Sequence, residues 1–178
     1  MSVALDQSAD AEFVRFVARF CGVNLNAAAS GQLRVRFGNS MELREPTTIA
    51  KYLTRLADRE HELLGETPFE RAQVAMWLDF ARRTQRCAPC SAASVSLWKV
   101  LESALQTKTY LVANRVTLAD AALFYVLHAA MSSFQSVQRK QFVSLVRWFD
   151  QVQHTAGVRG FRNLEVVPFE HKPLAFTT

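Results

Sequence analysis

The sequence predicts a small α/β lobe followed by an all-α bundle. Three observations predict it: an amphipathic helix at residues 11–21, strict apolar alternation at residues 32–37, and a nearly uninterrupted helical pattern from Pro46 onward. The 178-residue chain is 49% hydrophobic and 21% charged, which is ordinary for a chain that folds into one or two small lobes. We expect the lobe at residues 1–60, the bundle at residues 61–163 and a surface tail at residues 164–178.

The first element is a helix over residues 11–21. Phe13, Phe16 and Phe20 recur at helical spacing, with Val17 beside them, and Gly22 follows at the end. One apolar face of this helix should therefore pack into a core.

Two strands follow a loop rich in Ser, Asn and Ala. Residues 32–37 alternate apolar and polar side chains, and Gly38-Asn39 turns the chain into a second strand at residues 40–43. We predict no strand between Ser2 and Ser8. A lobe of roughly fifty residues buries too little surface to be more than marginally stable alone, so we expect it to pack against the bundle.

The remaining segments are predicted as helices. The first, at residues 45–60, has Pro46 in its first turn and Ile49, Leu53 and Leu56 on one face. The others are expected at residues 67–83, 91–108, 116–131 and 142–154.

The helix at residues 67–83 carries apolar side chains on two flanks. Thr67, Pro68 and Glu70 have the spacing of a capping box with proline in the first turn. One stripe consists of Val74, Trp77, Leu78 and Ala81, and the second flank consists of Ala72, Ala75 and Met76. The helix is therefore either central to its bundle or in contact with another chain.

Polar residues within the apolar helices are interpreted as structural. Thr117 and Asp120 have capping-box spacing, and such a cap contributes about 0.5 to 2 kcal/mol. His128 is expected as a hydrogen-bonded core histidine, and Trp98 and Trp148 as core aromatics.

The net charge of +5 favours acidic partners or RNA without deciding between them. Arg82, Arg83 and Arg86 lie at a predicted helix end, where they complement the helix dipole. No stretch reaches the roughly 20 apolar residues of a membrane span, and the first residues lack a secretory pattern. We therefore expect a location inside the cell.

The three cysteines do not predict a disulfide framework. Cys87 and Cys90 have the spacing of a redox pair, but they follow a helix rather than a strand, which argues against thioredoxin chemistry. The four histidines show no spacing typical of a metal site. Cys21 and its two companions are expected as free thiols.

A family resemblance rests on four segments. TTIAKYL (47–53), ELLGETPFERAQVAMWLDF (62–80), YLVANRVTLADAALFYVLH (110–128) and VRWFDQVQHTAGVR (146–159) are similar to the elongation-factor-1-epsilon-like auxiliary subunits of the multi-aminoacyl-tRNA synthetase complex. These belong to the glutathione-transferase-like proteins. The resemblance implies a reduced thioredoxin-like lobe followed by a transferase-type helical domain.

The features that bind glutathione in transferases are altered here. The N-terminal stretch offers only Ser2 and Ser8 to contact a thiolate, and Arg34 aligns with the cis-proline of the family. Glu45-Pro46 replaces the Glu-Ser pair, although proline provides neither a hydroxyl group nor an amide hydrogen. We therefore expect no catalysis and no cofactor.

The resemblance implies two partner surfaces. Tyr52, Ala72 and Met76, on the helices at 47–59 and 67–84, would contact methionyl-tRNA synthetase. Arg147 and Gln151, on the helix at 142–154, would contact glutamyl-prolyl-tRNA synthetase, with Arg147 forming an ion pair.

Other functions stay open at this point. The resemblance implies other synthetase-complex subunits as partners, and a nuclear role in the DNA-damage response beside a cytoplasmic one. Competing hypotheses are a divergent glutathione transferase and a protein that binds tRNA through its arginines. Without the resemblance, Arg147 is an ordinary solvated arginine beside the core residue Trp148.

Overall fold

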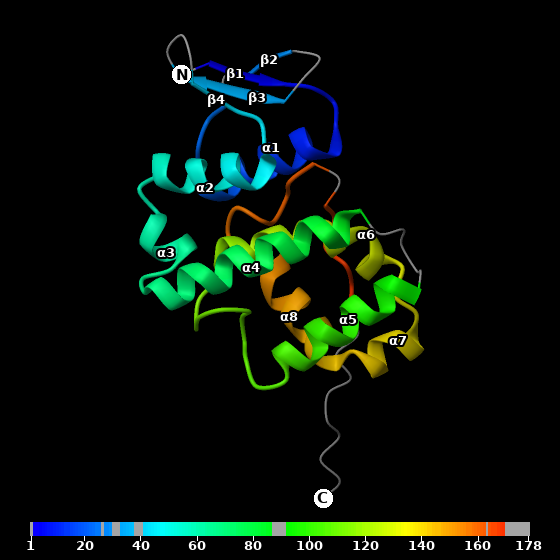
Figure 1. The fold of residues 1–178 in the computed structure, drawn as a ribbon. Coiled ribbons are helices and arrows are strands. Elements are labelled where there is room, and N and C mark those ends of the chain that lie inside the picture. Colours follow the sequence, from blue (N-terminus) through cyan, green and yellow to red (C-terminus); the bar gives the residue numbers. More distant parts are fainter. Residues whose placement is uncertain are drawn as a thin grey trace, which may run out of the picture.

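A computed structural model of the chain describes residues 2–25, 27–29, 33–37, 41–86, 92–162 and 164–169. The strands are β1 (Ser2–Leu5), β2 (Ala27–Ala29), β3 (Arg34–Phe37) and β4 (Met41–Leu43). The helices are α1 (Ala9–Cys21), α2 (Pro46–Leu56), α3 (Glu60–Leu64), α4 (Pro68–Gln85), α5 (Ala92–Leu105), α6 (Leu118–Ser132), α7 (Ser136–Gln141) and α8 (Val143–Gln153). Figure 1 shows the sheet at one end of the molecule, α1 and α2 on one side of it, and the other helices beyond them.

The sheet has the order β2-β1-β3-β4. β1 pairs in parallel with β2, and β3 pairs antiparallel with β1 and β4. Val3 lies opposite Val35, which lies opposite Leu43, and both valines are buried. Arg36, opposite Glu42, is exposed. Because side chains alternate along a strand, the apolar residues share one face and the charged residues share the other.

Two strands correct the sequence-based predictions. The prediction of no strand between Ser2 and Ser8 is wrong, because β1 is the strand that joins β2 to β3. The segment expected as a loop contains β2, which consists of three alanines. Both strands are short and depend on backbone pairing, so neither carries a strong alternation signal.

Helix α1 confirms its prediction. The side chain of Ser8 caps the helix by accepting a hydrogen bond from the Ala11 amide, and Gly22 ends it with φ of 76°. Phe13, Phe16 and Phe20 are all buried. A positive φ is adopted without strain by glycine, so the helix stops where the sequence indicated.

The helix predicted at residues 45–60 ends earlier, at Leu56, and a separate short helix that was not predicted, α3, follows at Glu60–Leu64. Asp58 adopts a φ of 55°, which ends the helical path between Leu56 and Glu60. Ile49 and Leu53 are buried as expected, but Leu56 is 47% exposed. The last turn of α2 therefore leaves an apolar side chain on the surface.

Helix α6 lies at the centre of the bundle and contacts α1, α4 and α8. Its capping box is present, since Thr117 and Asp120 bind each other's backbone at the start of the helix. Trp98 and Trp148 are buried, as predicted. None of the described helices has the length and apolar character of a membrane span.

Residues 164–169, expected as part of a surface tail, pack against the bundle instead. Val167 is buried, and its N–H and C=O groups bond to the side-chain amide of Gln153 at 3.0 and 3.1 Å. His128 Nε2 lies 2.8 Å from the carbonyl oxygen of Glu165, which confirms a hydrogen-bonded core histidine. The glutamine amide pairs with the segment much as a neighbouring strand would.

Candidate functional site

The cleft between the lobe and the bundle is closed by an ion-pair cluster. Arg82, on α4, donates to both carboxylate oxygens of Asp10, on α1, at 2.5 and 3.3 Å. Its Nε also lies 3.8 Å from Glu45, at the start of α2. The sequence-based interpretation of Arg82 as a helix-end cation is confirmed, because it lies in the last turn of α4. The structure shows in addition that it joins three helices across this cleft.

Glu45 occupies the N-terminus of its own helix. Its carboxylate accepts hydrogen bonds from the amides of Thr47 and Thr48 at 3.1 and 2.5 Å, and from the Thr47 hydroxyl at 2.7 Å. Burial raises the pKa of Glu45, but these hydrogen bonds outweigh it, and the pKa is lowered. An ionised side chain thus fills the place where an external carboxylate would bind.

The remaining candidates for a thiol site have structural positions. Ser8 caps α1 and also donates to Asp6 at 2.5 Å. Ser2 lies in β1 and Arg34 in β3, and none of the described peptide bonds is cis. The Cys21 thiol is buried, and this burial raises its pKa to about 11. Cys87 and Cys90 lie outside the described residues.

The cavity left in this cleft is small. It leaves a volume of about 0 Å³ for water-sized molecules and is lined by Phe13, Leu78, Arg82 and Ala122 among others. Sites for small molecules typically have volumes of about 300 to 1,000 Å³. The described residues also contain no group of His, Cys, Asp and Glu that could hold a metal ion. The other candidate sites lie on the surface.

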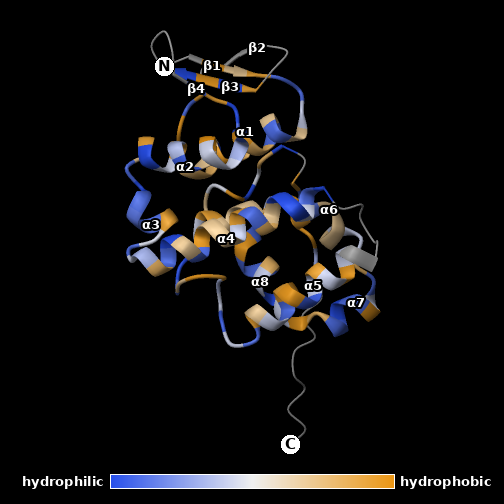
Figure 2. Cartoon of the chain, in the orientation of Figure 1, coloured by the Kyte–Doolittle hydropathy of each residue, from blue (hydrophilic) through white to orange (hydrophobic). Residues whose placement is uncertain are grey.

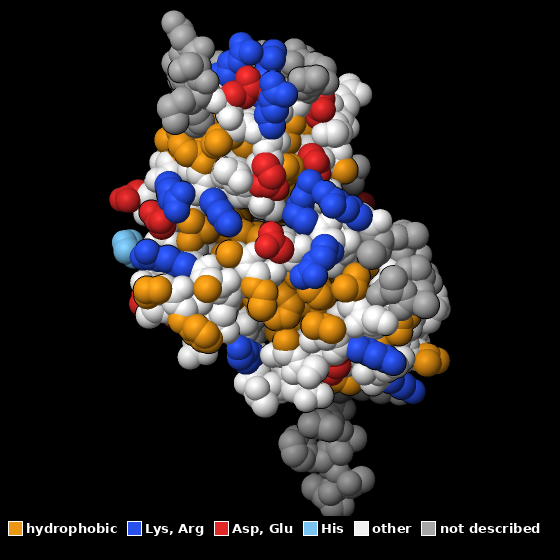
Figure 3. Space-filling view, viewed as in Figure 1, with side chains coloured by type: hydrophobic (Ala, Val, Ile, Leu, Met, Phe, Trp, Pro, Cys, Tyr) orange, Lys and Arg blue, Asp and Glu red, His pale blue; other side chains and the backbone are white. Residues whose placement is uncertain are grey.

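Helices α2 and α4 expose a set of apolar side chains. We call Tyr52, Leu56, Phe69, Ala72 and Met76 the α2–α4 surface. Phe69 is 72% exposed and Met76 is 49% exposed. The three α4 members are spaced by three and four residues, so they share one face of that helix. Figure 2 shows apolar residues along α4, and Figure 3 shows hydrophobic side chains gathered over it beside a band of charged ones.

The sequence predictions found part of this surface. Ala72 and Met76 belong to the predicted second flank of α4, and both are exposed, whereas Tyr52 is half-buried. Phe69 and Leu56 were not identified. Phe69 could have been found from its spacing to Ala72 and Met76, while Leu56 was expected on the buried face of its helix.

Helix α8 provides the second candidate surface. We call Val143, Arg147 and Gln151 the α8 surface; they recur every four residues, all are exposed, and Val143 is 61% exposed. The structure thus brings the two predicted residues, Arg147 and Gln151, onto one helix face. Val143 was not identified from sequence.

Arg147 has a structural role that the sequence did not reveal. Its Nη2 donates to the carbonyl oxygens of Leu105, the last residue of α5, and of Lys108, just after that helix, at 2.7 and 2.9 Å. In return, the carboxylate of Glu102 on α5 accepts the amides of Ser144 and Leu145 at the start of α8. Each helix therefore caps the other, and both caps complement the helix dipoles.

Comparisons with known proteins place this chain in a family. Residues 70–156 match the family described as nuclear-export cofactor Arc1p. The human eukaryotic translation elongation factor 1 epsilon-1 is 37% identical over 122 residues, which cover 68% of this chain and 69% of that protein. The bifunctional glutamate/proline–tRNA ligase of Drosophila melanogaster is 33% identical over 104 residues, which cover 58% of this chain and 6% of the ligase.

The solved structures agree on the fold. The GST-like domain of elongation factor 1-gamma from Saccharomyces cerevisiae superposes with a TM-score of 0.73. It has 16% sequence identity and covers 93% of this chain and 94% of that domain. The fold is therefore glutathione-transferase-like, and the chain belongs to the eukaryotic translation elongation factor 1 epsilon-1 family.

Proposed function

We propose that this chain is a non-catalytic docking subunit of the multi-aminoacyl-tRNA synthetase complex. It joins methionyl-tRNA synthetase to glutamyl-prolyl-tRNA synthetase by contacts between transferase-like domains. The observation that carries the proposal is the combination of a cleft closed by Arg82 with two exposed surfaces on different helices. A fold whose cleft is filled by the described side chains still offers surfaces for protein contacts.

The relatives support pairing with synthetases. The stretch of the Drosophila ligase that is similar to this chain is only 6% of the ligase, so a segment of this kind lies within a much longer synthetase. Domains of one fold commonly associate through matching surfaces related by a twofold axis. A synthetase with such a domain is therefore a suitable partner for the chain.

The α2–α4 surface suits the contact with methionyl-tRNA synthetase. Its exposed phenylalanine and methionine are residue types enriched in the buried centres of interfaces. Burying an apolar side chain of this size contributes about 1.5 to 3 kcal/mol. A partner that covers Phe69 and Met76 would gain most of its affinity there.

The α8 surface suits the contact with glutamyl-prolyl-tRNA synthetase. Only Nη2 of Arg147 has a hydrogen bond to the described residues, which leaves Nε and Nη1 for a partner carboxylate. Gln151 adds a polar contact on the same face, and Val143 adds an apolar one. We place this assembly in the cytoplasm, with a second population in the nucleus.

The test is a pull-down with the two purified synthetases and single variants of this chain. Met76→Asp should reduce binding of methionyl-tRNA synthetase by about tenfold or more, with binding of the other synthetase unchanged. Val143→Asp should reduce binding of glutamyl-prolyl-tRNA synthetase and leave binding of methionyl-tRNA synthetase unchanged. Val166→Asp is the matched control, because Val166 is 43% exposed and belongs to neither surface. Equal retention of both synthetases by all variants would remove the assignment.

Gln151→Glu is preferable to Arg147→Glu in this assay. A change at Arg147 also removes the cap of α5, so loss of binding could follow from local unfolding. Gln151 is exposed on the same helix face, and changing it leaves that cap intact. Retention on immobilised glutathione, measured in parallel, tests the transferase alternative, and retention would contradict the docking proposal.

A further inference from the structure

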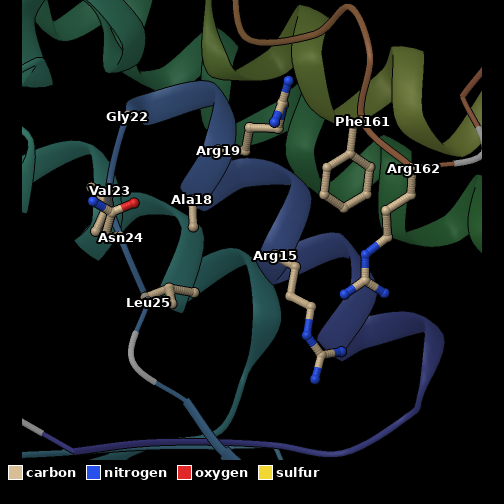
Figure 4. A pocket seen from close by; sticks show the side chains of 9 residues that line it. All are labelled: Arg15, Ala18, Arg19, Gly22, Val23, Asn24, Leu25, Phe161 and Arg162. Atoms are coloured by element: carbon tan, nitrogen blue, oxygen red, sulfur yellow. The ribbon is translucent and has the colours of Figure 1, made fainter.

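A second cavity lies on the far half of α1, distinct from the closed cleft. It has a volume of about 400 Å³ and is formed by α1, residues 22–25 and the segment that contains Phe161 and Arg162. Figure 4 shows Arg15, Arg19 and Arg162 around it. The volume lies in the range of small-molecule sites. None of its lining residues belongs to the α2–α4 surface or the α8 surface.

Positive charge exceeds negative charge at this cavity. Arg15 donates to Glu12 at 2.7 Å, and Arg162 donates to both Glu12 oxygens at 2.9 and 2.7 Å. Figure 4 shows the guanidinium groups of Arg15 and Arg162 next to each other. Two arginines therefore share the Glu12 carboxylate. Arg15 also donates to the carbonyl oxygen of Asp6 at 3.1 Å, and its charge acts on the Asp6 carboxylate.

Arg19 adds a third guanidinium group at the rim. It turns away from the other two in Figure 4, and its Nη2 lies 3.5 Å from the carbonyl oxygen of Arg159, the outer limit for a hydrogen bond. Its charge has no carboxylate within ion-pair distance among the described residues. The three arginines thus face two carboxylates, those of Glu12 and Asp6, and one positive charge is in excess.

The wall between these charges is apolar. Ala18 and Phe161 are buried, and Val23 and Leu25 are half-buried beside the cavity. A ligand that fits would combine an anionic group with a compact apolar or aromatic part. A phosphate monoester carries about −1.5 to −2 charges at neutral pH, which suits a cavity with three guanidinium groups and a net positive charge. The planar guanidinium group of arginine can donate two parallel hydrogen bonds to phosphate oxygens, which makes arginine well suited to bind phosphate.

We propose that this cavity binds a small phosphorylated molecule of mononucleotide size. The phosphate lies between Arg15 and Arg162, Arg19 attracts it from the rim, and the apolar part lies against Val23 and Leu25. Glu12 competes with the phosphate for the same two arginines. Because of this competition, we expect that removing the negative charge of Glu12 increases the affinity for the phosphorylated ligand.

The test is calorimetric titration of the full chain with AMP, inorganic phosphate and adenosine. AMP should bind more tightly than inorganic phosphate, and adenosine should not bind measurably. Arg162→Ala should weaken AMP binding by about tenfold, since a charge-assisted hydrogen bond is lost. Glu12→Gln should tighten it several-fold. Arg44→Ala, at an arginine that pairs with Glu42 on the sheet, is the matched control and should leave AMP affinity unchanged.

Further measurements test whether the phosphate can belong to an RNA terminus as well as to a free nucleotide, and whether each variant is folded. A 5′-phosphorylated RNA oligomer should bind like AMP, and the same oligomer without its terminal phosphate should not. Arg162→Lys keeps the charge but not the planar guanidinium group, so its affinity should lie between those of the parent chain and Arg162→Ala. Circular dichroism shows whether each variant is folded. Absence of AMP binding, an unchanged affinity in Arg162→Ala, or weaker binding in Glu12→Gln would each overturn the proposal.

Discussion

The indole Nε1 of Trp148 donates a hydrogen bond of 2.8 Å to the carboxylate of Asp120, which joins α8 to the start of α6. Both side chains are fully buried. The same carboxylate accepts the amides of Leu111 and Thr117, at 3.0 and 2.9 Å, and the Thr117 hydroxyl at 2.8 Å. One side chain therefore organises a helix start, the loop before it and a second helix.

Asp120→Ala should be strongly destabilising. It leaves the buried donors of Trp148, Leu111 and Thr117 without an acceptor, and each unsatisfied group costs about 1 to 3 kcal/mol. We expect a loss of about 3 to 5 kcal/mol in the free energy of unfolding, measured by urea titration. The exposed residue Asp79 provides the control, and Asp79→Ala should change stability little. A loss below about 1 kcal/mol in Asp120→Ala would contradict a central role for this carboxylate.

The reciprocal caps between α5 and α8 predict coupling between Glu102 and Arg147. Arg147→Ala and Glu102→Ala should each cost about 0.5 to 2 kcal/mol, because each removes a helix cap. Gln151→Ala, on the same face as Arg147, should cost almost nothing. A double-mutant cycle measured by urea unfolding checks this relationship. Strict additivity of the two losses would indicate that the caps act independently.

The segment at 164–169 should contribute to stability through Gln153. Gln153→Ala removes both hydrogen bonds to Val167 and leaves a buried N–H group unsatisfied, at a cost of about 1 to 3 kcal/mol. Hydrogen exchange at the Val167 amide should then become faster. If the amide of Val167 exchanged at the same rate in the variant and the parent chain, the pairing would not hold the segment in solution.

Acid should destabilise the protein through its paired glutamates. The hydrogen bonds from Arg59 lower the pKa of Glu62, and burial of Glu45 is outweighed by its bonds to Thr47 and Thr48, so its pKa is also lowered. A carboxylate with a lowered pKa in the folded state stabilises the fold above its unfolded pKa, about 4.3, and loses this contribution as pH falls through the folded pKa.

Asp120 acts in the opposite direction. Burial raises its pKa, and its hydrogen bonds only partly offset that effect, so its contribution declines as pH rises through the folded pKa. Urea unfolding at pH 7 and at pH 3.5 should show lower stability in acid, and Glu62→Gln should make the difference smaller. Because Asp120 opposes the glutamates, the decisive comparison is with the variant: a difference between pH 7 and pH 3.5 that is the same in Glu62→Gln as in the parent chain would contradict the assignment of Glu62 as an ionised, paired group.

The sequence predicted the elements whose signals are local. The periodicity of Phe13, Phe16 and Phe20 identified α1, and the spacing of Thr117 and Asp120 identified the start of α6, because each pattern lies within a few turns of helix. β1, β2 and the short helices α3 and α7 were missed, since short elements depend on neighbours distant in the chain. The division between α2 and α3 depends on the φ of one residue, Asp58.

The sites were predictable only where they lie along one helix. Ala72 with Met76, and Arg147 with Gln151, share helix faces, so spacing alone places them together. Arg82 with Asp10 and Arg162 with Glu12 are separated by 72 and 150 residues, and no local pattern connects them. The cap from Arg147 to α5 was missed for the same reason, because its acceptors are 42 and 39 residues away.

The most direct test of the docking account is a quantitative binding measurement of Met76→Asp and Val143→Asp against both synthetases. The account predicts that Met76→Asp loses methionyl-tRNA synthetase alone and that Val143→Asp loses glutamyl-prolyl-tRNA synthetase alone. A chain that binds neither synthetase, or variants that lose both or neither, would contradict two separate docking surfaces.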